Sequence, residues 1–248
     1  MELQVVLVLL AIVFAAFVKG FVGFGFPLIS VPMVALIVDP KTAVIAMSIP
    51  TMLSNVMVLL RGNVRWSDVR RALPFIVPLI VAAIVGAALL PRLDPRFLGL
   101  IIGVVSAGFS LLSLVRLRPT LSPAQERVAS PLMGIVSGLL GGATTIYGPL
   151  VALYFQTLRY DKWPFVYVIS IVFLAGTLAQ NVTYATLRLY QPEAVLYGLL
   201  SCLPVYAGVH LGMLVNRKAS RPIFNYLVLL VVLLSSLNLI ARGLHLVG

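Results

Sequence analysis

The chain has 248 residues, of which 61% are hydrophobic and only 10% are charged, and its mean hydropathy of +1.10 lies far above that of a soluble domain. These values exclude a soluble globular protein and indicate a polytopic membrane protein. The formal net charge is +11, but the basic residues are scattered between apolar stretches and form no face with interleaved aromatic residues. We therefore expect no nucleic-acid partner. The single cysteine, Cys202, excludes an internal disulfide.

The apolar stretches predict an all-α membrane protein with about ten helical elements, because no segment has the period of two that a membrane barrel requires. The first stretch lacks the basic start and the small-residue cleavage site of a signal peptide, so we expect it to be retained. Two of the elements, 27–38 and 149–158, are shorter than the about 20 residues that span a bilayer, and we expect them to be half-helices. The expected elements are 3–18, 27–38, 42–61, 71–90, 96–116, 131–142, 149–158, 164–187, 193–216 and 221–241.

The distribution of Lys and Arg between alternate connections predicts the orientation in the membrane. With Lys19 left aside, twelve basic residues fall on one side and five on the other. The richer side is expected to be cytoplasmic. Both termini then lie outside, and the cluster Arg61, Arg65, Arg70 and Arg71 lies in the cytoplasm.

Glycines and prolines recur at intervals of 117 to 127 residues, which indicates an internal duplication. Each half contains five elements, an odd number, so the second half enters the membrane inverted relative to the first. We expect a first membrane repeat at 1–118, a cytoplasmic linker at 119–129 and a second, inverted repeat at 130–248. The matched positions are Gly20 with Gly138, Gly23 with Gly141, Pro32 with Pro149, Gly86 with Gly212, and Pro95 with Pro222.

Each predicted half is interrupted by a glycine-rich break, "KGFVGFGFP" at 19–27 and "GLLGGATTIYGP" at 138–149. Glycine lets the backbone leave helical geometry, and proline favours the first turn of the next helix. The half-helices then begin near Pro27 and Pro149, and their free amides and positive dipole ends suit an anion. We expect the two hairpin tips to meet near the membrane centre, with Gly20, Gly138, Pro27 and Pro149 as hinges.

The "GFVGFG" stretch with Pro32 downstream, the second "GIVSGLLGGATTIYGP", the duplication and the length near 250 residues resemble the sulfite exporter TauE/SafE family over the whole chain. The resemblance implies a multi-pass transporter without an ATPase domain in a bacterial inner membrane. It implies export of sulfite or of a small organosulfonate such as sulfoacetate. An anion channel and a non-transporting membrane scaffold remain as alternatives, and a homo-oligomer is possible.

The residues near the breaks supply the candidate ligands of a small anion. Backbone amides and hydroxyl groups donate hydrogen bonds to an oxyanion, and a lysine supplies the opposite charge. Motifs for a phosphate-binding loop, a metalloprotease site or paired catalytic carboxylates are missing, so we expect neither an enzyme nor a cofactor or metal. The candidate substrate-binding residues are Lys19, Gly23, Phe24, Gly25, Asn55, Gly141, Gly142, Thr144, Thr145 and Tyr147.

Structural roles are open for several of these residues. Lys19 is either a ligand or an interfacial lysine that extends to the lipid headgroups. The hydroxyl groups of the second break either bind the anion or hydrogen-bond freed backbone carbonyls. The amides Asn55, Gln180 and Asn181 are typical of contacts between membrane helices. His210 is either packed between helices or coupled to protons.

Overall fold

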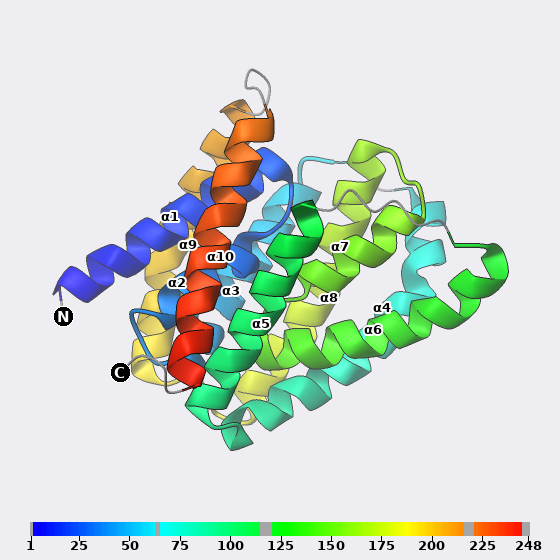
Figure 1. Ribbon diagram of the computed structural model, residues 1–248. Helices are drawn as coiled ribbons and strands as arrows, with labels where there is room; N and C mark the ends of the chain where they lie inside the picture. Colours follow the sequence, from blue (N-terminus) through cyan, green and yellow to red (C-terminus); the bar gives the residue numbers. More distant parts are fainter. Residues whose placement is uncertain (1, 63–64, 115–120, 216–220, 245–248) are drawn as a thin grey trace.

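The computed structural model describes residues 2–62, 65–114, 121–215 and 221–244, and every regular element within these ranges is a helix (Figure 1). The all-helical fold with about ten elements is thereby confirmed. A short 3₁₀ turn, η1 (Leu90–Arg92), follows the fourth helix. The α-helices are α1 (Glu2–Val22), α2 (Phe26–Ala35), α3 (Pro40–Leu59), α4 (Trp66–Leu89), α5 (Pro95–Leu114), α6 (Pro123–Thr144), α7 (Gly148–Thr157), α8 (Lys162–Thr186), α9 (Pro192–Val215) and α10 (Arg221–Gly243).

Six of these helices, α1, α3, α4, α5, α8 and α9, contain stretches long and apolar enough to cross a membrane. The helices α2 and α7 have 10 residues each, which corresponds to about 15 Å at 1.5 Å per residue, half the thickness of the hydrocarbon core. The prediction of two short helices is confirmed.

Helix α6 begins earlier than expected because Ser122 and Gln125 form a capping box, in which each side chain bonds the backbone of the other. Residues 123–129 of the expected linker are therefore helical. Residues 119–120 of that linker lie outside the described ranges, as do the basic residues Arg116, Arg118, Arg217 and Lys218.

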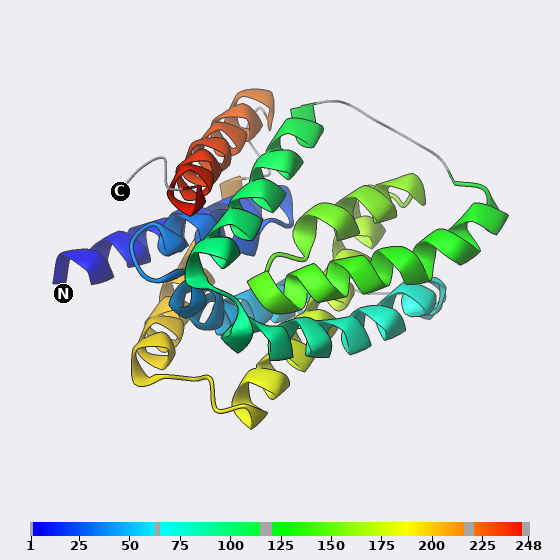
Figure 2. The same cartoon turned by 60° about the horizontal axis from the view of Figure 1, so that its bottom comes forward.

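The two ends of the molecule differ in the elements that they hold. The start of α1 and the end of α10 lie at the same end in both views (Figures 1 and 2), and Gln4 and Gly243 line one pocket of about 510 Å³ there. We call this end the termini face. Helices α4 and α6 begin at the other end, where Arg71 of α4 pairs with Glu126 of α6. We call this end the opposite face.

The most extensive helix pairs join one half of the chain to the other: α4 packs along α6, α1 along α9, and α5 along α10. Glycines bring these backbones together. A Cβ atom at Gly138 of α6 would collide with the backbone oxygen of Leu79 in α4. A Cβ atom at Gly20 of α1 would likewise collide with that of Val209 in α9. The expected hinge residues Gly20 and Gly138 therefore lie inside helices, at close helix crossings.

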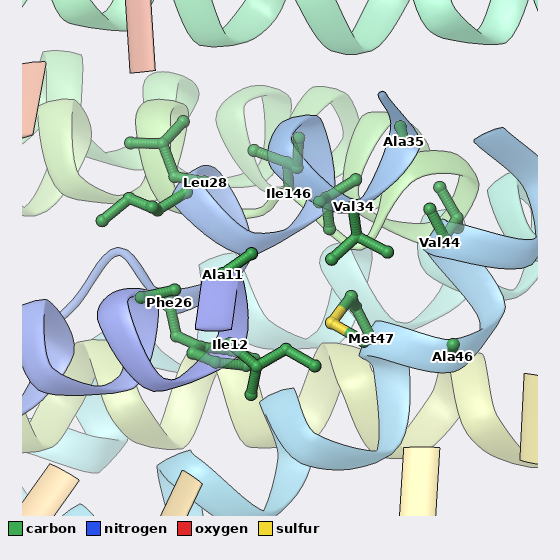
Figure 3. Close-up of a cluster of buried hydrophobic side chains, with 14 of the residues drawn as sticks. Ala11, Ile12, Phe26, Leu28, Val34, Ala35, Val44, Ala46, Met47 and Ile146 are labelled. Atoms are coloured by element: carbon green, nitrogen blue, oxygen red, sulfur yellow. The ribbon is translucent and has the colours of Figure 1, made fainter. Parts of the chain in front are cut away.

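The buried apolar side chains form two clusters. The larger one joins α1, α2 and α3 with residues of α9 and α10 and includes Ile146 from the second break. Figure 3 shows Ile146 beside Leu28 and Val34 of α2. The smaller cluster joins α4, α7 and α8. Phe24 and Phe165 pack against both clusters and so lie between them.

The two breaks lie at different depths along α3. Lys19, one turn before the first break, donates to the Asn55 side chain near the end of α3. Thr145, at the second break, donates its hydroxyl to the carbonyl oxygen of Val44 near the start of α3, at 3.0 Å. The helical rise between Val44 and Asn55 is about 16 Å. The hairpins pass each other, with α2 in contact with α7, and the expectation that their tips meet at one level is wrong.

Candidate functional site

The first break is made by two glycines with left-handed backbone. Gly23 has a φ of 101° and Gly25 a φ of 97°, backbone angles that residues with a Cβ atom rarely adopt. The amide of Gly23 closes the last turn of α1 by donating to the carbonyl oxygen of Lys19 at 2.7 Å. Pro27 follows in the first turn of α2. Gly25 is buried, yet a Cβ atom there would meet nothing within 4 Å, so there is internal space beside the start of α2.

Lys19 is buried in the protein, with 1% of its surface exposed, which excludes extension of its side chain to the headgroups in this conformation. Its Nζ donates to Oδ1 of Asn55. The Nδ2 of Asn55 donates in turn to the carbonyl oxygen of Thr51 at 3.0 Å. Among the described residues no carboxylate forms an ion pair with Lys19, whose bonded partner is a neutral amide.

Phe24 lies at the tip of the first hairpin. Its ring makes edge contacts with Phe109 of α5 and with Phe165 of α8, each at 6.4 Å between centroids. The neighbouring Gly23 lies against Val166 of α8, where an added Cβ would approach a side-chain carbon to 2.9 Å. These contacts cover the first break with apolar side chains from both halves of the chain.

The second break begins at Thr145, whose φ of 64° is left-handed without glycine. Its hydroxyl donates to Val44, that of Thr144 donates to the carbonyl oxygen of Leu140 at 2.7 Å, and that of Tyr147 to Gly176 at 3.0 Å. All three predicted hydroxyl ligands therefore donate to backbone carbonyls in this conformation. This arrangement matches the structural role that the sequence left open.

Gln180 of α8 organises the second break and was not among the predicted site residues. Its Nε2 lies 2.9 Å from the carbonyl oxygen of Gly142 and 3.2 Å from that of Gly141. It also lies 3.0 Å from Oγ1 of Thr145. Both carbonyls belong to the last turn of α6. The carbonyl of Gly141 still accepts from the amide of Thr145 at 2.7 Å, but that of Gly142 has lost its helical donor, because the amide of Ile146 donates to Oγ1 of Thr144. Gln180 thus supplies a donor that the break removes from Gly142. Tyr184 adds a further bond by donating to Gly142 at 3.0 Å.

A short motif repeats in α3 and α8. The stretch "TMLSNV" at 51–56 corresponds to "TLAQNV" at 177–182. Asn181 donates its Nδ2 to the carbonyl oxygen of Thr177 at 2.6 Å, the counterpart of the bond from Asn55 to Thr51. Its Oδ1 accepts from the hydroxyls of Ser48, at 2.9 Å, and Tyr190. Asn55 and Asn181 are separated in the sequence by the same interval as Gly86 and Gly212. This repeated interval is a sequence signal from which Asn181 could have been predicted as the counterpart of Asn55.

The predicted ligands consequently form two separate groups. The first break gathers Lys19, Gly23, Phe24 and Gly25 near the end of α3, together with Asn55. The second break gathers Thr144, Thr145 and Tyr147 near the start of α3, with Gly141 under the Tyr147 ring and Gly142 against the backbone of α4. Pro27 and Pro149 lie in the first turns of α2 and α7.

The opposite face carries two charged contacts. Arg71 donates to both carboxylate oxygens of Glu126, at 2.8 and 2.6 Å, and this guanidinium lowers the pKa of the Glu126 carboxyl. The guanidinium of Arg61 contacts Nδ1 of His210. His210 stacks on Tyr206, at 6.2 Å between ring centroids, as expected of a packed histidine.

Comparison with known proteins identifies the family. No curated protein and no solved structure matches the chain. Among the residues that the structure describes, no three His, Cys, Asp or Glu side chains gather in a way that would hold a metal ion. The family model of the sulfite exporter TauE/SafE matches residues 8–239, nearly the whole chain, and the helices that carry both breaks fall inside this match. The chain belongs to the sulfite exporter TauE/SafE family of membrane transport proteins.

Proposed function

We propose that the protein is a secondary transporter that exports sulfite or a small organosulfonate, such as sulfoacetate, by alternating access. The family supports a membrane exporter of a sulfur compound. The observation that carries the finer proposal is Lys19, a buried lysine whose bonded partner is a neutral amide. A buried charge is unfavourable without an opposite charge, and a bound anion supplies one.

The anion is proposed to bind at the first break. The amides of Phe24 and Gly25 lie within two turns of Lys19 in the chain, before the positive end of α2. The amide of Gly23 joins them when its present bond to the carbonyl oxygen of Lys19 opens. The internal space beside Gly25 supports this position. Hydrogen bonds to a charged group contribute about 1.5 to 3 kcal/mol each, so several donors together offset the loss of hydration. Asn55 fixes the position of the Lys19 amine by accepting its hydrogen bond.

The second break is proposed to serve the other half of the transport cycle. Gly141, Gly142, Thr144, Thr145 and Tyr147 become available when the hairpin of α6 and α7 moves and their present hydrogen bonds open. The stagger of the breaks along α3 supports two stations for the anion, one toward each face.

An inverted repeat with halves at 1–118 and 130–248, joined by a linker at 119–129, is proposed to underlie this cycle. The helix contacts support it. In such a repeat each of α1 to α5 corresponds to the helix five places later. The contact between α4 and α6 then corresponds to that between α9 and α1, and the contact between α3 and α9 to that between α8 and α4. The pairs α3 with α8 and α5 with α10 convert into themselves. The repeated Thr51–Asn55 and Thr177–Asn181 bonds agree.

The termini face is proposed to be the outer side of a bacterial inner membrane, and the opposite face the cytoplasmic side. The excess of basic residues on the opposite face supports this orientation. The first break, near the end of α3, then lies toward the cytoplasm, where export begins.

Flux into proteoliposomes tests the function. The purified protein is expected to carry sulfite or sulfoacetate with saturation, and Lys19→Met is expected to abolish this flux. Lys41→Met is the matched control, because Lys41 lies at the termini face and donates to the carbonyl oxygen of Pro91. Flux without saturation would favour a channel. A folded protein without any flux would favour a scaffold.

A further inference from the structure

We propose that Lys19 takes up one proton when the anion binds and releases it when the anion leaves, so that each anion is carried together with a proton. This inference rests on the proposed anion site at the first break. It assigns to Lys19 a second ligand, the proton, besides the charge that it presents to the substrate.

The contact of Lys19 suits both of its protonation states. Oδ1 of Asn55 accepts one proton from Nζ, and a neutral amine offers that donor as well as an ammonium does. The amide nitrogen of Asn55 is engaged with Thr51, so the carboxamide keeps its oxygen toward Lys19. A neutral amine then has one further N–H group and a lone pair outside this bond, whereas an ammonium has two further N–H groups and a charge that this pair does not neutralise.

No carboxylate among the described residues forms an ion pair with Lys19, and the helices packed around it supply no opposite charge in contact with it. Helix α1 packs against α9 and α2, and Asn55 comes from α3. Helix α2 contains no titratable residue, and Lys41 of α3 lies in its first turn at the termini face. On α9, Val209 packs against Gly20, and the adjacent His210 contacts the guanidinium of Arg61. Glu193 lines the pocket at the termini face. The other titratable residues of α9 are Tyr197, Cys202 and Tyr206.

These surroundings link the proton to the anion. In the empty site the neutral amine is favoured, because Lys19 is buried without an opposite charge and burial disfavours the charged form. A bound anion reverses this preference by its opposite charge. The step is R–NH₂ + H⁺ + A⁻ → R–NH₃⁺···A⁻, with the proton taken from water on the side to which the site is open. Release of the anion on the other side returns the proton to water there.

The linkage has a consequence for the net charge moved. A sulfonate monoanion that travels with one proton moves no charge, whereas a dianion moves one negative charge. Where the cytoplasm is more alkaline than the outside, the accompanying proton opposes export, so net export is driven by a higher anion concentration inside. Proton and anion affinities must change together, because each binding event favours the other. Where the empty site is neutral, affinity for the anion is expected to fall about tenfold per pH unit as the pH rises.

Proton uptake during binding tests the inference. Methanesulfonate is a suitable probe because it does not itself titrate near neutral pH. Detergent-purified full-length protein in weak buffer with an indicator dye is titrated from about pH 6 to about pH 10, around the ordinary range of amines. Dialysis against labelled methanesulfonate measures binding in parallel. The wild type is expected to take up close to one proton per bound anion at the alkaline end. Lys19→Arg is expected to bind without uptake, because guanidinium stays protonated.

The outcomes separate the two proposals. Wild-type binding with no more proton uptake than Lys19→Arg at any pH overturns the inference and leaves the anion site intact. Absence of binding of methanesulfonate, sulfite and sulfoacetate to the folded wild type overturns the anion site itself. A Lys19→Arg variant that fails to fold does not remove the test. A pH gradient across wild-type proteoliposomes is expected to drive accumulation of the anion on the alkaline side, and absence of this accumulation while downhill flux persists overturns the inference.

Discussion

Asn55 and Asn181 make the same hydrogen bond in opposite halves of the chain, each donating its Nδ2 to the carbonyl oxygen of a threonine one turn earlier, at 3.0 and 2.6 Å. What their oxygens accept differs. Asn55 accepts from the amine of Lys19, whereas Asn181 accepts from the hydroxyls of Ser48 and Tyr190. One arrangement that occurs twice in the chain thus carries a titratable amine at Asn55 and neutral hydroxyls at Asn181.

Asn55→Asp is expected to weaken anion binding at least about tenfold, or about 1.4 kcal/mol. The new carboxylate pairs with Lys19 and competes with the substrate for its charge. Isothermal calorimetry with sulfite measures the effect. Asn181→Asp is the matched control, because Asn181 contacts hydroxyl groups and no lysine. Equal affinities of Asn55→Asp and the wild type would contradict the role of Lys19.

Gln180→Met is expected to destabilise the protein by about 1 kcal/mol, because the buried hydrogen bonds from Gln180 to the carbonyls of Gly141 and Gly142 are lost, while each carbonyl keeps one other donor, the Thr145 amide and the Tyr184 hydroxyl. The volume of the side chain is nearly kept, so the lost hydrogen bonds dominate. Thermal unfolding of the detergent-purified protein measures the change. Gln156→Met, at an exposed position of α7, should leave the midpoint nearly unchanged. Equal unfolding midpoints of Gln180→Met and Gln156→Met would contradict the proposed role of Gln180 at the second break.

Gly142→Ala is expected to destabilise the contact between α4 and α6 by about 1 to 3 kcal/mol, because its methyl group would collide with the backbone oxygen of Ala83. Gly108→Ala in α5 is the control, since an added Cβ there meets nothing within 4 Å and alanine favours the helix. Unfolding midpoints in one detergent compare the two. A lower midpoint for Gly108→Ala than for Gly142→Ala would refute the close crossing.

The ion pair between Arg71 and Glu126 predicts a pH dependence at the opposite face. Arg71 lowers the folded-state pKa of the Glu126 carboxyl. The stabilisation is therefore present above the ordinary carboxyl pKa and is lost as the pH falls through the lower folded value. It amounts to about 1 kcal/mol or less, because the pair is partly exposed. The difference in unfolding free energy between wild type and Glu126→Gln should shrink in acid. A constant difference at all pH values would contradict the pairing.

The sequence predicted the helices well and their arrangement only in part. Glycines 23 and 25 and Pro27 marked the first short helix, because left-handed backbone and a proline in the first turn leave clear signals. The depth of the breaks could not be predicted, since it depends on which residues of α3 lie beside Lys19 and Thr145. Such contacts are set by side chains distant in sequence, as between Thr145 and Val44.

The candidate ligands show the same limit. The burial of Lys19 follows from its place in an apolar helix, but its partner Asn55 is fixed only by the packing of α1 and α3 on α9 and α2. The hydroxyl groups at the second break were predicted correctly as polar groups inside the protein. Their donation to carbonyls could not be separated from ligand binding by sequence, because the same donors serve both purposes.

Helix α9 packs along α1, and α4 packs along α6, so each of these helices has its main partner in the other half of the chain. This arrangement affects how the chain assembles during synthesis. Helix α1 enters the bilayer long before its partner α9 is translated, and the glycine-bearing strip around Gly20 must wait among lipid tails until then. The first five helices alone leave α4 without α6, so we expect a truncated first half to be captured by quality-control proteases. The two halves made as separate chains should instead rescue each other, because each supplies the helix that the other lacks.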